Sequence, residues 1–75
     1  MTRVQTESGI RNKQVDLHKG LEIAVITGYE IRTDKWPIHI YIDGKKVEGQ
    51  WIVDSMDEAF DAGFQVAQQE IEARS

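Results

Sequence analysis

The fold is decided in the stretch WPIHIYIDGKKVEGQWIV, residues 36–53. Apolar side chains alternate with other side chains along both of its ends, and alternation of this kind is typical of β-strands with one buried face. Asp43 and Gly44 interrupt the alternation. An Asp-Gly pair between two alternating runs is a strong signal for a β-hairpin turn. The stretch therefore predicts two antiparallel strands joined at these two residues.

A third alternating run precedes this hairpin in residues 20–32. Its apolar side chains at odd positions are Leu21, Ile23, Val25, Tyr29 and Ile31. If Ile31 pairs with Trp36, then Val25 faces Ile42 and every apolar partner falls on one face of the sheet. The three runs together predict a three-stranded antiparallel meander.

Two registers are open for the second hairpin. With residues 43–44 as the whole loop, Trp36 faces Trp51. With a loop over 43–46, Ile38 faces Trp51. The two registers differ by two residues, so each side chain keeps its face of the sheet in either case.

A helical period replaces the period of two after the third strand. Ser55 followed by Glu58 is a capping box, which predicts a helix beginning at about Met56. Gly63 lies within the apolar stripe of this helix. Glycine destabilises an exposed helix, so we expect that Gly63 is present because it lets the helix pack closely on the sheet. The stripe consists of Met56, Phe60, Gly63, Phe64, Ala67 and Ile71. We predict an α+β fold, β-β-β-α, in which a C-terminal helix packs on one face of the meander.

Length and composition indicate one small domain. The chain has 75 residues, of which 40% are hydrophobic and 29% are charged, as in ordinary globular domains. Residues 1–17 are polar without a sustained period, so we expect a disordered lead there and a single domain over 18–75. The alternative is a short extra edge strand over 14–17. No run resembles a signal peptide or a membrane span, which predicts a cytoplasmic protein.

Charge and motifs argue against several function classes. The net charge is −4. By segment, the charge is +1 over residues 1–17, 0 over residues 18–53 and −5 over residues 54–75. An acidic helix is a poor partner for a phosphate backbone. The chain has no cysteine, no glycine-rich phosphate loop, no nucleophile elbow and no histidine-carboxylate metal motif. We therefore predict no enzyme activity, no cofactor and no metal site, and His18 has no evident catalytic companion.

One predicted surface is left without a structural role. Side chains of the opposite parity point away from the helix, onto the second face of the sheet. The candidates for an interaction surface there are Ala24, Ile26, His39, Tyr41 and Ile52. A solvated antiparallel face of mixed composition is the alternative interpretation. Trp36 and Trp51 share the parity of the buried set, so we expect them in the core.

The chain resembles small bacterial domains of unknown function. The resemblance is carried by HKGLEI (residues 18–23), WPIHIYI (36–42) and DEAFDAGFQVAQQEI (57–71). It covers about residues 18–73 and implies a three-stranded meander closed by one helix. The order β-β-β-α is also similar to the latter part of a double-stranded RNA-binding domain, but that family has a basic helix start where this chain has SMDE, residues 55–58.

These observations favour a protein-interaction module. A core this small rarely leaves more than about 3–5 kcal/mol of net stability, and self-association is one usual supplement. We predict that the chain binds a protein partner or forms a homodimer through the second sheet face, with no membrane and no small-molecule ligand inferred. The alternative is a nucleic-acid-binding accessory protein that uses its loops and the basic residues Arg3, Arg11 and Lys13.

Overall fold

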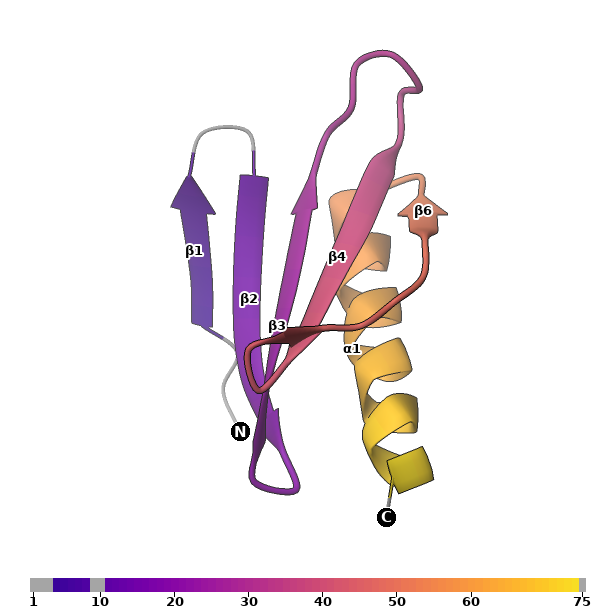
Figure 1. Cartoon of the computed structure of the whole chain (residues 1–75). Coiled ribbons are helices and arrows are strands. Elements are labelled where there is room, and N and C mark those ends of the chain that lie inside the picture. Colours follow the sequence, from indigo (N-terminus) through magenta and orange to yellow (C-terminus); the bar gives the residue numbers. More distant parts are fainter. Residues whose placement is uncertain (1–3, 9–10, 75) are drawn as a thin grey trace.

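An antiparallel sheet carries a long helix on one of its faces (Figure 1). The computed structural model describes residues 4–8 and 11–74. Its elements are β1 (Val4–Ser8), β2 (Arg11–His18), β3 (Leu21–Gly28), β4 (Trp36–Ile42), β5 (Lys45–Lys46), β6 (Trp51–Val53) and α1 (Met56–Arg74). The strand order is β1-β2-β3-β4-β5, and β6 also pairs with β4. The predicted α+β class with a C-terminal helix is confirmed, and the expected meander corresponds to β3, β4 and the β5–β6 segment.

The sheet extends beyond the predicted meander on its N-terminal side. We expected a disordered lead over residues 1–17, and this prediction is wrong for the residues described, because β1 and β2 are strands. β2 pairs with β3 along its whole length. The alternative strand over 14–17 falls inside β2, which is longer and is flanked by β1. Lys19 and Gly20 form the tight β2–β3 turn, with φ angles of 53° and 78°. Positive φ at both central residues matches the twist of antiparallel strands.

The β3–β4 hairpin has a register two residues away from the predicted one. Val25 pairs with Ile40 and not with Ile42. The connection is longer than expected, and an isolated bridge joins Glu30 to Lys35 beyond the end of β3. Because the shift is an even number of residues, the helix-facing side chains keep their predicted face.

This longer connection moves two predicted core residues into solvent. Tyr29 is 39% exposed and Ile31 is 84% exposed. Their assignment to the buried stripe was wrong, because β3 ends at Gly28 and the alternation no longer describes the backbone beyond it. Tyr29 packs instead against Trp36, with ring centroids 5.6 Å apart and planes tilted by 56°, a usual aromatic arrangement.

The second hairpin begins with the tighter of the two predicted registers. Ile42 pairs with Lys45 around the Asp43-Gly44 turn. The φ angles of these turn residues are 52° and 83°, as the Asp-Gly signal predicts for a two-residue loop.

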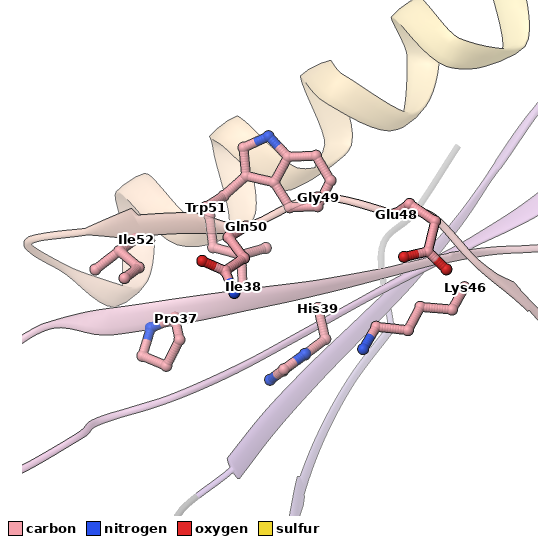
Figure 2. Close-up of a pocket in the computed structure, with 9 residues that line it drawn as sticks. All are labelled: Pro37, Ile38, His39, Lys46, Glu48, Gly49, Gln50, Trp51 and Ile52. Atoms are coloured by element: carbon pink, nitrogen blue, oxygen red, sulfur yellow. The ribbon is translucent and has the colours of Figure 1, made fainter.

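The looser register takes over further along the same hairpin. Ile38 pairs with Trp51 in the β4–β6 ladder. Residues 47–50 absorb the shift of two residues between β5 and β6 (Figure 2). Gly49 adopts a φ of 139°, and a Cβ at this position would lie 2.7 Å from Cη2 of the Trp51 indole. Both predicted registers are therefore present, each in one part of the hairpin.

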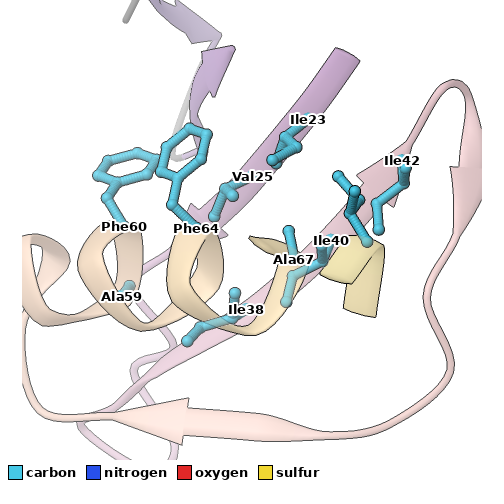
Figure 3. Close-up of a cluster of buried hydrophobic side chains, with 10 residues drawn as sticks. Ile23, Val25, Ile38, Ile40, Ile42, Ala59, Phe60, Phe64 and Ala67 are labelled. Atoms are coloured by element: carbon cyan, nitrogen blue, oxygen red, sulfur yellow. The ribbon is translucent and has the colours of Figure 1, made fainter. Parts of the chain in front are cut away.

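The core lies between α1 and strands β3 and β4 (Figure 3). Its buried members are Ile23, Val25, Ile38, Ile40, Ile42, Ala59, Phe60, Phe64, Ala67 and Ile71. Trp36 and Trp51 are partly buried and pack against this cluster, which agrees with their predicted core role. The parity of the apolar residues therefore predicted the buried face of β3 and β4.

The helix begins and packs as the sequence predicts. The backbone N–H of Glu58 donates to Oγ of Ser55 at 3.2 Å, so Ser55 caps the first turn. Gly63 is buried against the sheet: a Cβ there would lie 2.5 Å from Cγ1 of Val25. The glycine therefore sets how closely α1 approaches β3.

Candidate functional site

The five predicted surface residues lie on the sheet face opposite α1, which we call the open face. Ala24 pairs with Tyr41 and Ile26 pairs with His39 in the β3–β4 ladder. Since directly opposed residues share a face, these four side chains form two adjacent rows. Ile52 continues the surface on β6, where it is 60% exposed. The sequence-predicted residues are therefore brought together on one surface.

The open face is hollowed in three places. One hollow of about 270 Å³ is lined by Lys13, Glu22, Ala24, Ile26, Tyr41 and Gly44. A second, of about 420 Å³, lies along β4 and the β5–β6 segment and is lined by Pro37, Ile38, His39, Lys46, Glu48, Gly49, Gln50, Trp51 and Ile52 (Figure 2). A third, of about 220 Å³, is lined by Arg11, Gly28, Tyr29, Glu30, Pro37 and His39. All five predicted residues line at least one hollow.

Strand β2 adds residues to this face that the alternation in β3, β4 and β6 does not predict. Lys13 pairs with Ile26, and Val15 pairs with Ala24. Leu17, two residues further along β2, is 48% exposed. The odd positions of β2 therefore continue the open face. The weak alternation of Val15 and Leu17 was the available signal, and it became informative only with the register to β3.

The open face carries charges of both signs around an apolar centre. Lys13 and Glu22 line the hollow that contains Tyr41. Lys46 pairs with Tyr41 across the β4–β5 ladder, and Glu48 shares the larger hollow with it. In the described part of the chain, no ion pair joins either lysine to a carboxylate. Both cations are thus available to a ligand or partner.

His39 is a titratable group on this face, and it lines two of the hollows. Burial lowers the pKa of His39 below the ordinary histidine value, and the positive charges of Lys46 and Arg11 lower it further. Desolvation and like charges both disfavour the imidazolium. Both effects favour the neutral imidazole of His39.

His18 does have a partner, at the opposite end of the molecule from the β3–β4 connection. Its Nε2 lies 3.0 Å from Oε1 of Glu72, and Nζ of Lys19 donates to Oε2 of the same carboxylate at 2.7 Å. These contacts tie the β2–β3 turn to the last turns of α1. The bonds to Lys19 and His18 lower the pKa of Glu72. His18, Lys19 and Glu72 therefore connect the β2–β3 turn to α1, and they lie away from the hollows of the open face.

The last candidates concern charged side chains away from the open face. Lys35, in the connection between β3 and β4, pairs with Asp54. Among residues 4–8 and 11–74, no group of three or more His, Cys, Asp or Glu side chains is arranged to hold a metal ion. In the same described residues, no helix has the length and apolar character needed to cross a membrane. Comparison of the chain with protein-family models, curated protein sequences and solved structures found no match.

Proposed function

We propose that this chain is a cytoplasmic, non-enzymatic interaction module that forms a homodimer through the open face of its sheet. The observation that carries the proposal is the apolar centre formed by the half-buried Ile26 and Tyr41 beside the buried Ala24, extended by Leu17 and Ile52. α1 covers the opposite face of the sheet, while Ile52 is 60% exposed and Leu17 is 48% exposed. Contiguous apolar surface with a polar rim is typical of protein interaction sites.

A second copy of the chain fits this surface because the surface complements itself. Lys13 and Glu22 flank Ala24 and Tyr41 in one hollow. In a two-fold arrangement, each residue on one copy meets a different residue on the other, and the pairs occur twice. A two-fold axis near Tyr41 therefore brings Lys13 of one copy towards Glu22 of the other while the apolar centres cover each other.

Sedimentation analysis over a range of protein concentrations tests the proposal. We expect a reversible monomer–dimer equilibrium for the wild type. Tyr41→Glu places a charge in the proposed interface and should yield a monomer with an unchanged circular dichroism spectrum. Gln65→Glu is the matched control, since it adds the same charge at an exposed position of α1, and it should dimerise like the wild type. A wild-type protein that stays monomeric at the highest concentrations contradicts the proposal.

The second candidate function is nucleic-acid binding. Arg11, Lys13 and Lys46 favour it, because the register and the hollows group these cations on the open face. Arg3, the other basic residue named for this role, lies outside the described residues. Glu22 and the acidic helix oppose it. Measuring the affinity for DNA and RNA at several salt concentrations tests this candidate. A binding constant whose logarithm falls linearly with the logarithm of the salt concentration supports it, and the absence of binding at low salt contradicts it.

A further inference from the structure

Two hollows of the open face meet at His39 and Pro37. The larger, about 420 Å³, falls within the usual size range of small-molecule sites. Pro37 and Ile52 give it apolar surface, while His39 and Lys46 give it polar groups. Figure 2 shows the Lys46 side chain beside the His39 ring, with Ile52 and Pro37 further along β4 and β6. Glu48 lines the same hollow beside Lys46 (Figure 2), so one end of the hollow carries charged side chains and the other is apolar.

Two cations flank His39 at the charged end of the hollow. Lys46 approaches His39 from β5, and Arg11 approaches it from the start of β2 on the side of the smaller hollow. Neither cation forms an ion pair with a carboxylate of the described residues. The other charged side chains on these surfaces are Lys13, Glu22, Glu30 and Glu48. The lining as a whole carries three cations and three carboxylates, so the positive charge is local to His39, on which Lys46 and Arg11 act.

We propose that this hollow binds an organic anion, with its carboxylate or phosphate between Lys46, His39 and Arg11 and its apolar body over Pro37 and Ile52. A bound anion offsets the repulsion between the two cations and a protonated imidazole, so binding is accompanied by proton uptake at His39. Affinity therefore increases as the pH falls through the histidine range. One chain supplies every one of these residues, so the inference does not rest on the proposed homodimer; because Ile52 belongs to both surfaces, the anion binds the monomer and competes with dimerisation.

NMR titration of the uniformly labelled full chain with benzoate tests this inference. The protein is kept at a concentration where sedimentation shows a single species. We expect benzoate to shift the signals of His39, Lys46 and Ile52 together and to raise the pKa of His39. Benzyl alcohol, which lacks the charge, should bind more weakly, and inorganic phosphate, which lacks the apolar body, should leave Ile52 unshifted.

Two lysine variants make the test specific. Lys46→Gln should weaken benzoate binding about two- to fivefold, the range for a solvent-accessible ion pair. Lys45→Gln is the matched control, because Lys45 pairs with Ile42 and so belongs to the helix side of the hairpin. The inference is overturned if benzoate leaves His39 and Ile52 unshifted at pH 6, if the pKa of His39 does not rise, or if both variants weaken binding equally.

Discussion

Replacing Gly63 by alanine tests whether this glycine sets the distance between helix and sheet. In an exposed helix the change stabilises by about 1 kcal/mol. Here the new Cβ would lie 2.5 Å from Cγ1 and 3.1 Å from Cγ2 of Val25, and 3.3 Å from Cγ2 of Ile38. Val25 is fully buried, and its β-branched side chain has little rotamer freedom with which to move aside.

The clash outweighs the gain in helix propensity. Overpacking a core by one methyl group costs about 1–3 kcal/mol. Subtracting the propensity gain leaves Gly63→Ala less stable than the wild type by about 1 kcal/mol. For a domain of this size, that loss lowers Tm by about 4–8 °C. Urea denaturation gives the free energy of unfolding, and thermal denaturation gives Tm.

Two further variants separate the clash from other effects. Gln65→Ala changes an exposed position of the same helix and should leave stability within about 0.5 kcal/mol of the wild type. Gly63→Ala combined with Val25→Ala should be more stable than the sum of the two single losses predicts, because the smaller side chain makes room for the new methyl. A Gly63→Ala protein that gains stability, as in an exposed helix, refutes the reasoning.

Three other predictions concern separate parts of the fold. Gly49→Ala should lower the free energy of unfolding, measured by urea denaturation, by about 1–3 kcal/mol, because φ is 139° there and the new Cβ would meet the Trp51 ring. Gly44→Ala is the comparison, because nothing lies within 4 Å of a Cβ at that position. Equal stability of the two variants would show that the indole contact adds nothing. Glu72→Gln should be less stable than the wild type at neutral pH, because Lys19 and His18 lower the pKa of Glu72. A lowered carboxylate pKa gives stability that is present above the ordinary glutamate pKa and is lost as pH falls through the folded-state pKa, so a difference between the two proteins that persists at the lowest pH contradicts this cause. The pKa of His39, followed by NMR of its ring protons, should lie below the ordinary histidine value and rise in Lys46→Gln. Since the unfolded chain holds that proton more tightly, acidification through the histidine range destabilises the protein, and Lys46→Gln should reduce this loss.

The parts of the fold that the sequence predicted are those that α1 covers. Alternation in β3 and β4 assigned Val25 and Ile40 to the correct face, although their pairing was off by two residues. A register error of two residues does not change the face on which a side chain lies, because side chains along a strand return to the same face every two residues. Loop geometry, which decides the register, depends on contacts such as the Glu30–Lys35 bridge that have no distinctive sequence signal.

Strand β2 was missed because it lies at the margin of the helix. Its helix-side positions carry polar side chains such as Asn12 and Asp16, since α1 packs mainly on β3 and β4. A strand that is not covered on that face needs no apolar stripe, so periodicity had little to detect. Because β2 was not predicted, the residues that it contributes to the candidate site were not predicted either. The five open-face residues on β3, β4 and β6 followed from parity alone, whereas the positions of Arg11 and Lys13 required the β2–β3 register.

Intermolecular NOEs measured in a mixture of isotope-labelled and unlabelled protein test the central claim most directly, because they identify the surface through which two copies meet. If the open face forms the homodimer, filtered spectra at high concentration contain cross-peaks between the Tyr41 ring of one copy and the Ile26 methyl groups of the other. They contain none from exposed positions of α1 such as Gln65. Intermolecular cross-peaks confined to the helix, or none at any concentration, contradict the account.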